Sequence, residues 1–183
     1  MIPSTVNKPN LFAILLTMFG LLLFSGNLQA QLTIEWDRTY GGSGFEEMNA
    51  ALPTSDGGYI YGGITTTRSI SGEITQHTKD TVAWPEPEGD FWILKTDGQG
   101  NPVWDKIIGG FAQERLWSIV ETQDGGYLVG GYSRSGIGAD KTWTNRGEKD
   151  FWVVKLDGNG NKQWDRAYGG TGNEELRKII ALP

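Results

Sequence analysis

The fold of this chain is decided by a stretch that occurs twice, as Asp56-Gly57-Gly58-Tyr59-Ile60-Tyr61-Gly62-Gly63 and as Asp124-Gly125-Gly126-Tyr127-Leu128-Val129-Gly130-Gly131. In both copies, aspartate and glycine supply the backbone conformation of a tight hairpin turn. The residues that follow the turn have the composition of a β-strand. A stretch that returns after so long a period indicates stacked units of supersecondary structure, none of which buries its apolar faces alone.

Tryptophan-aspartate pairs divide the chain into repeats. Each pair leads into two glycines, as in Trp36-Asp37 with Gly41-Gly42, and the pair returns at Trp104 and Trp164. The pairs define one repeat over residues 36–103, a second over 104–163, and an incomplete third from 164. The third repeat would place its Asp-Gly-Gly turn beyond Pro183, so the sequence reads as a piece of a longer protein.

Each complete repeat is expected to hold four short strands. The third strand is apolar on both of its alternating faces, which is typical of a sheet covered on both sides. The fourth strand carries the tryptophan-aspartate pair. The strands are expected near residues 47–54, 59–65, 90–95 and around Trp104 in the first copy, and near 115–122, 127–133, 150–155 and around Trp164 in the second.

Four antiparallel strands per unit, stacked between like units, form a β-propeller blade. The sequence therefore predicts an all-β fold, a partial β-propeller of two complete four-stranded antiparallel blades with flanking strands. The run Asp150-Phe151-Trp152-Val153-Val154-Lys155 with its turns resembles the β-propeller repeat of secreted proteins from Gram-negative bacteria. The resemblance covers 36–183 and implies a secreted or cell-surface protein, because such proteins often carry a C-terminal sorting domain.

The first thirty residues have the pattern of a secretory signal peptide. Lys8 is followed by an apolar stretch from Leu11 to Phe24, and the segment ends in the small residue Ala30. A stretch of 14 residues is too short to cross roughly 30 Å of hydrocarbon as a helix. We therefore expect residues 1–30 to be removed and residues 31–183 to form the repeat region of a protein that is extracellular, on the cell surface or periplasmic, with no membrane span.

Composition excludes several kinds of chemistry. The chain has no cysteine, so disulfides, thiolate metal sites and a cysteine nucleophile are excluded. The net charge of −6 disfavours binding to nucleic acid. His77 is the only histidine, and we expect neither a cofactor nor a metal. We expect a non-catalytic module for recognition or a structural role. The alternative is a glycosidase that uses two carboxylates, for which Glu46 and Glu114 are the candidates.

The loops between the second and third strands are the predicted binding region. They span Thr66–Gly89 (24 residues) and Arg134–Lys149 (16 residues), so they account for the whole difference in length between the two repeats. Their tryptophans, Trp84 and Trp143, are candidates for contact with a glycan or a protein ligand. The alternative is that each ring covers the core of its own blade. Because it is long and polar, the first loop is expected to be the least ordered segment.

Three glutamates recur at one position of the repeat. Glu46, Glu114 and Glu174 each follow the second glycine of the pair by four residues. Carboxylates on one end of the fold would suit a cation or a polyol. The alternative is that each glutamate accepts hydrogen bonds from the neighbouring backbone and fixes the corner between blades. The run Asp157-Gly158-Asn159-Gly160-Asn161 resembles the start of a calcium loop, but it lacks the later glutamate and fits a hairpin turn.

The predicted blades leave apolar faces and strand edges without a partner. Residues 31–40 resemble a fourth strand suited to completing a last blade that this sequence does not encode, and residues 174–183 resemble the first strand of a third blade. Such edges and faces favour association. We therefore expect residues 31–183 to be only marginally stable as a monomer, and either to form a homo-oligomer or to require further blades.

Overall fold

A computed structural model describes residues 34–79 and 88–182 of the chain. The chain divides into two parts, Met1–Glu35 and Trp36–Pro183, and every strand belongs to the second part. The predicted signal peptide lies outside the described residues. Among the residues described, no helix is long and apolar enough to cross a membrane.

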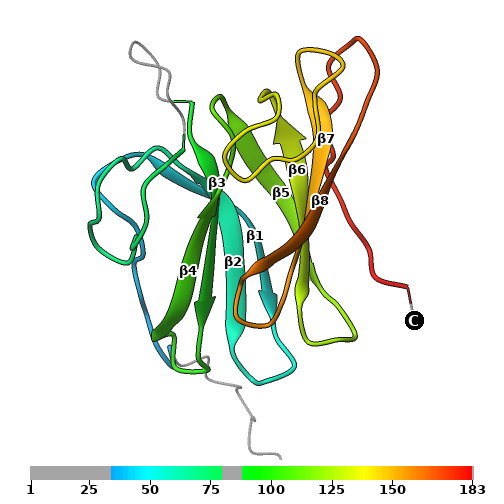
Figure 1. Cartoon of the computed structure of the whole chain (residues 1–183). Helices are drawn as coiled ribbons and strands as arrows, with labels where there is room; N and C mark the ends of the chain where they lie inside the picture. Colours follow the sequence, from blue (N-terminus) through cyan, green and yellow to red (C-terminus); the bar gives the residue numbers. More distant parts are fainter. Residues whose placement is uncertain (1–33, 80–87, 183) are drawn as a thin grey trace, which may run out of the picture. The chain divides into compact units, whose positions relative to one another are not determined.

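The described residues form two four-stranded antiparallel sheets (Figure 1). The first sheet has the order β1-β2-β3-β4 and the second β5-β6-β7-β8. The strands of the first sheet are β1 (Glu46–Pro53), β2 (Tyr59–Thr65), β3 (Asp90–Thr96) and β4 (Pro102–Ile108). Those of the second sheet are β5 (Glu114–Glu121), β6 (Tyr127–Ser133), β7 (Asp150–Leu156) and β8 (Lys162–Tyr168). The predicted all-β fold and the eight strands are confirmed, with small shifts at the ends of the first and third strands of each sheet. Each sheet ends on the tryptophan-aspartate strand that begins the next repeat.

The two sheets share the same register, including an irregularity in their first strands. In β1, Met48 pairs with Gly63 and Ala50 with Gly62, so Asn49 has no partner opposite it. In β5, the unpaired residue at the same position is Trp117. A β-bulge of this kind brings the two backbones close together. A Cβ atom built at Gly63 would lie 1.7 Å from the carbonyl oxygen of Glu47, so the position requires glycine.

The Asp-Gly-Gly turns between the first and second strands are also alike in detail. Gly57 has a φ of 83°, and Asp56 accepts a hydrogen bond of 3.0 Å from the Gly58 N–H. Asp56 also forms an ion pair of 2.9 Å with Lys95, whose side chain is buried. Hydrogen bonds from the Thr54 hydroxyl, from Lys95 and from the Gly58 N–H lower the pKa of Asp56 to about 2. In the second sheet, Asp124 makes the same contacts with the corresponding residues.

One apolar core lies between the two sheets. It joins Ile60, Phe91 and Ile93 of the first sheet to side chains of the second that include Leu116, Val129, Trp152 and Val154. Trp92 and Trp152 occupy the same register position, opposite Gly63 and Gly131, and both are buried. Trp152 belongs to the core between the sheets. Trp92 belongs to a second cluster, with Ile74, Leu94 and Ile107, on the face of the first sheet that points away from the second.

Two segments outside the sheets continue the pattern. The N-terminal flank, which we define as residues 36–40, places Trp36 against Tyr59, with ring centres 5.6 Å apart. Trp104 of β4 lies against Tyr127 in the same way, at 6.0 Å. The C-terminal flank, residues 174–182, packs on the second sheet, where the Ile179 N–H donates to the Ser118 hydroxyl at 2.9 Å. Neither flank pairs with a strand among the described residues, although both lie where the repeat would place one.

Candidate functional site

The three recurring glutamates lie at the corners that lead into β1, β5 and the C-terminal flank. Each accepts a hydrogen bond from the N–H of the second glycine of its pair, at 3.1 Å for Glu46, 2.6 Å for Glu114 and 2.9 Å for Glu174. Glu46 also accepts hydrogen bonds from the hydroxyls of Thr65 and Thr67, and Glu114 accepts one from Ser133. These are the contacts expected of a residue that fixes a corner.

Burial differs among the corner glutamates. Glu114 is 0% exposed, and burial raises the pKa of its carboxyl group. Glu46 and Glu174 are partly exposed, because the corner of Glu114 alone lies between the two sheets. To bind a cation or a polyol, the glutamates would have to give up the hydrogen bonds that hold the corners. Within residues 34–79 and 88–182, no three aspartate, glutamate or histidine side chains are grouped so that they could hold a metal ion.

The loops between second and third strands fold back against the outermost strand of their own sheet. Thr75 donates its N–H and its hydroxyl to the Asp105 carboxylate of β4. Thr142 makes the same two contacts with Asp165 of β8, at 3.0 and 2.6 Å. Ile74 is fully buried. The described part of the first loop therefore contacts its sheet through Ile74 and Thr75, whereas Trp84 lies outside the described residues.

These shared contacts define which loop positions are equivalent. Because Thr75 corresponds to Thr142, the residue that corresponds to Trp143 is Gln76 and not Trp84. The side-chain oxygen of Gln76 accepts a hydrogen bond of 3.3 Å from the Ile107 N–H, at the edge of β4. Nine residues separate Lys79 from Gly89, whereas two separate the corresponding Arg146 and Lys149. Most of the extra length of the first loop therefore lies between Lys79 and Gly89.

Trp143 lies at the outer edge of the second sheet and outside both core clusters. Its side chain is 38% exposed. The guanidinium of Arg166 lies 5.0 Å from the centre of the Trp143 ring and 5.9 Å from that of Trp164. A cation at this distance from an indole face holds the ring in place. The arrangement leaves an aromatic surface alongside β8 and gives no support to a role for Trp143 in covering the core.

Lys141 is a buried cation that sequence reasoning missed. It occupies the position of Ile74, as the isolated bridges Ser71–Ile74 and Gly138–Lys141 show. Its ammonium group donates to the Ser135 carbonyl at 2.7 Å and to the side-chain oxygen of Asn145. Burial lowers the pKa of Lys141, and the charges of Glu114, Asp150 and Asp165 oppose that effect. The one signal in the sequence is a lysine where the sister repeat has isoleucine.

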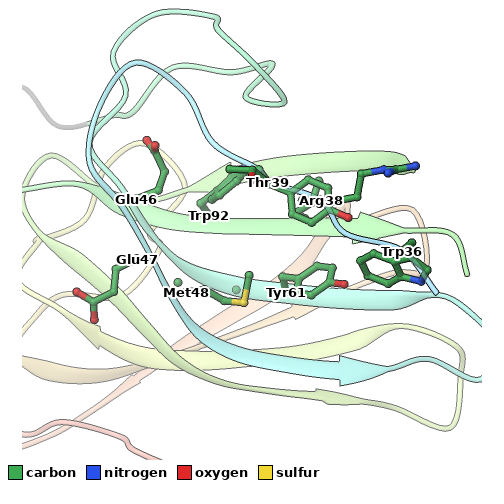
Figure 2. Close-up of a pocket in the computed structure, with 12 residues that line it drawn as sticks. Trp36, Arg38, Thr39, Glu46, Glu47, Met48, Tyr61 and Trp92 are labelled. Atoms are coloured by element: carbon green, nitrogen blue, oxygen red, sulfur yellow. The ribbon is translucent and has the colours of Figure 1, made fainter. Parts of the chain in front are cut away.

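A pocket of about 440 Å³ opens on the face of the first sheet that points away from the second (Figure 2). Its walls are aromatic and aliphatic, with the carboxylates of Glu46 and Glu47 at one end and the rings of Tyr61 and Trp36 at the other. The lining residues are Trp36, Arg38, Thr39, Tyr40, Glu46, Glu47, Met48, Tyr61, Gly62, Gly63, Trp92 and Leu94. The pocket is therefore a concave apolar surface made by the N-terminal flank and by β1, β2 and β3.

Comparison with models of known protein families finds no family that matches the chain. Comparison with curated proteins finds no relative. The function therefore has to be argued from the arrangement of the residues.

Proposed function

We propose that this chain is a β-propeller-type repeat module that acts outside the cytoplasm by recognition and not by catalysis. The fold supports the proposal, because two four-stranded antiparallel sheets stack through a shared core with equivalent registers. The turns, the bulges and the corner glutamates recur in both sheets. This is the construction expected of consecutive propeller blades.

The main support for the proposal is the location of the differences between the two sheets. The hairpin turns repeat contact for contact, and each corner glutamate accepts a hydrogen bond from its glycine pair, whereas the loops between second and third strands differ in length and in composition. At equivalent positions, Gln76 corresponds to Trp143 and Ile74 to Lys141. A rigid scaffold that varies in its loops at one end is the usual arrangement for binding.

Trp143 is the residue that we expect to meet the ligand. Its exposed ring is held by Arg166, which reduces the conformational entropy that binding would cost. An indole face of this kind suits the apolar face of a sugar ring, and a protein loop is the second candidate ligand.

The hydrogen bonds of the two candidate carboxylates favour recognition over the glycosidase alternative. Such an enzyme needs two carboxyl groups on either side of a bound substrate. Glu114 is fully buried and hydrogen-bonded to Gly110 and Ser133. Glu46 is hydrogen-bonded to Gly42, Thr65 and Thr67. Glu114 is therefore out of reach of a substrate, whereas Glu46 borders the pocket of the first sheet while its oxygens hold the corner.

A glycan array and a hydrolysis assay on the same sample of residues 31–183 test the proposal. We expect binding without release of reducing sugar. The variant Trp143→Gln introduces the residue of the sister loop and should weaken binding about tenfold or more, since a stacked ring contributes much of such an interface. Phe45→Gln is the matched control, because Phe45 is also an exposed aromatic residue but lies in the first sheet, directly before β1. Release of sugar would contradict the proposal, and so would equal binding by both variants.

The proposed location has a separate test. Expression of residues 1–183 in a Gram-negative host, followed by N-terminal sequencing of the exported protein, should give a chain that begins at Gln31. An intact first residue in the cytoplasmic fraction would contradict the location without affecting the binding test.

A further inference from the structure

The pocket on the first sheet corresponds, position by position, to a surface that is filled in the second sheet. Met48 is 54% exposed, whereas the corresponding Leu116 is 0% exposed. Tyr61, Trp92 and Leu94 correspond to Val129, Trp152 and Val154, which all belong to the core between the sheets. In that core the opposing side chains are Ile60, Phe91 and Ile93. The pocket is therefore the space that side chains corresponding to Ile60, Phe91 and Ile93 would occupy if another sheet lay against this face.

On the second sheet, the face that points away from the first sheet is more exposed than the corresponding face of the first sheet. Ile108 of β4 is 5% exposed, whereas Tyr168 of β8 is 56% exposed. Phe91 is fully buried against the second sheet, whereas the corresponding Phe151 is only partly buried. The side chains that make the interface inside the chain are therefore presented again, without a full partner, by Phe151, Trp164 and Tyr168.

The sequence indicates which kind of sheet fits each open face. Residues 36–48 and 164–176 are identical at nine of thirteen positions, namely Trp, Asp, Arg, Tyr, three Gly and two Glu. Residues 104–116, between the two sheets, share five of these positions with residues 36–48, namely Trp, Asp, two Gly and one Glu. The repeat therefore has a longer period of two sheets, 128 residues from Trp36 to Trp164. By this pattern, the neighbour that precedes a first sheet is a second sheet.

Charges near the first strands follow the same alternation. Glu47 of β1 forms an ion pair of 3.5 Å with Arg115 of β5. The corresponding residue of the C-terminal flank is again acidic, Glu175, and its pKa is lowered by Lys149 first and, to a smaller extent, by Arg177 and Arg115. If a second sheet preceded the first, its Arg115 would lie opposite Glu47, so the charges on the two open faces are complementary.

We propose that a second copy of this chain docks its second sheet onto the open face of the first sheet. Phe151 of one copy then enters the pocket against Trp92 of the other, as Phe91 lies against Trp152 within the chain. In a single copy, the two flanks occupy the places that strands of neighbouring copies would take. Residues 36–40 lie where β8 of one neighbour fits. The C-terminal flank, whose Leu176 and Ile179 lie against Gly130, lies where β1 of the other neighbour fits, so docking displaces the flanks. Neither flank has a strand partner among the described residues, whereas β8 and β1 are both part of a ladder.

This interface joins two different faces, so a dimer still presents one open face of each kind, one on each copy. Such a heterologous contact continues until it closes a ring or extends as a fibre. The inference goes beyond the proposed function, because it does not involve the loops or their ligand.

Sedimentation velocity of residues 31–183 over a range of concentrations tests the proposal. The variants Met48→Arg and Tyr168→Arg place a charge on one face each, at side chains that are exposed in the single copy. A charge buried in an apolar interface is costly, so each variant alone should associate about tenfold or more weakly than the unchanged protein. Ile137→Arg is the control, because Ile137 is equally exposed but lies in a loop.

Mixing the two variants gives the most specific result. Met48→Arg retains a working second sheet and Tyr168→Arg retains a working first sheet, so the mixture should form a dimer of one copy of each. Circular dichroism and the melting temperature of each variant should match the unchanged protein. A monomer at all concentrations would overturn the proposal, and so would association that both variants leave unchanged or a mixture that stays monomeric.

Discussion

The ring of Phe91 lies 5.0 Å from the ring of Trp152, with the two planes inclined at 42°. The two residues belong to equivalent strands, β3 and β7, and come from successive positions of the same Asp-Phe-Trp motif. Adjacent residues of a strand point to opposite faces of the sheet. The motif therefore supplies a phenylalanine to one neighbouring sheet and a tryptophan to the other, and one short sequence makes both halves of the interface.

Phe91→Ala should be among the most destabilising single changes in the chain. Removal of a fully buried phenylalanine from a core costs about 3–5 kcal/mol of unfolding free energy. Phe151→Ala is the matched control, because it changes the same motif where no third sheet covers it, and it should cost less. Urea denaturation of both variants at low protein concentration measures the difference. Equal losses would show that the core between the sheets does not hold them together.

Glu114→Gln should destabilise more than Glu46→Gln. Glutamine has one acceptor oxygen where the carboxylate has two, so the Gly110 N–H and the Ser133 hydroxyl can no longer both donate to the side chain, and a hydrogen bond to a charged group contributes about 1.5–3 kcal/mol. Glu46 makes the equivalent contact with Gly42, but its corner is partly exposed, so water replaces the lost partner. Chemical denaturation of the two variants checks the order. A larger loss for Glu46→Gln would contradict the corner role.

Alanine at Gly63 or Gly131 should disrupt the first hairpin of its sheet. The new Cβ would lie 1.7 Å from the Glu47 carbonyl oxygen, or 1.8 Å from that of Arg115, so the bulge has to move. We expect a loss of about 3 kcal/mol, the upper part of the range for overpacked sites. Gly136→Ala is the control, because a Cβ atom at Gly136 would have no neighbour within 4 Å, and it should change stability by less than about 0.5 kcal/mol. Thermal denaturation that shows no difference between these variants would contradict the assigned register.

Asp56→Asn should lower the melting temperature in a pH-dependent way. The Asp56 carboxylate is stabilised in the folded protein, where its pKa is lowered from 3.8 to about 2. A lowered pKa of an acid contributes stability above pH 3.8, and that contribution is lost as the pH falls through about 2. The gap between the unchanged protein and the variant should therefore be largest near neutral pH and close near pH 2. A gap that grows toward acid pH would have the wrong sign.

Much of the fold could be predicted from the sequence because the relevant signals are local. The Asp-Gly-Gly turns at Asp56 and Asp124 fix the hairpins, and alternation along the Asp-Phe-Trp strands indicates sheets with two covered faces. The two roles open to the corner glutamates could also be stated from their recurrence. The hydrogen bonds from the Gly42 and Gly110 N–H groups were needed to choose between a binding role and a structural role.

The loop equivalences could not be predicted, because they depend on contacts between distant residues. Trp84 and Trp143 look alike when they are counted back from the third strand. The hydrogen bonds of Thr75 and Thr142 to the outermost strands show instead that Gln76 corresponds to Trp143. Burial of Lys141 was missed for a related reason, since a lone lysine in a polar loop carries no signal of the carbonyl and amide oxygens that surround it.

The corner glutamates have a consequence for how such chains arise. Glu46 and Glu114 each bind a glycine of their own linker and hydroxyls of their own second strand, so the joint before a sheet travels with that sheet. A gene segment that is copied in tandem therefore encodes a new sheet together with a finished attachment to its neighbour. Lengthening or shortening of the array by a pair of sheets keeps both the corners and the alternation of the sheets, and the loops remain free to change.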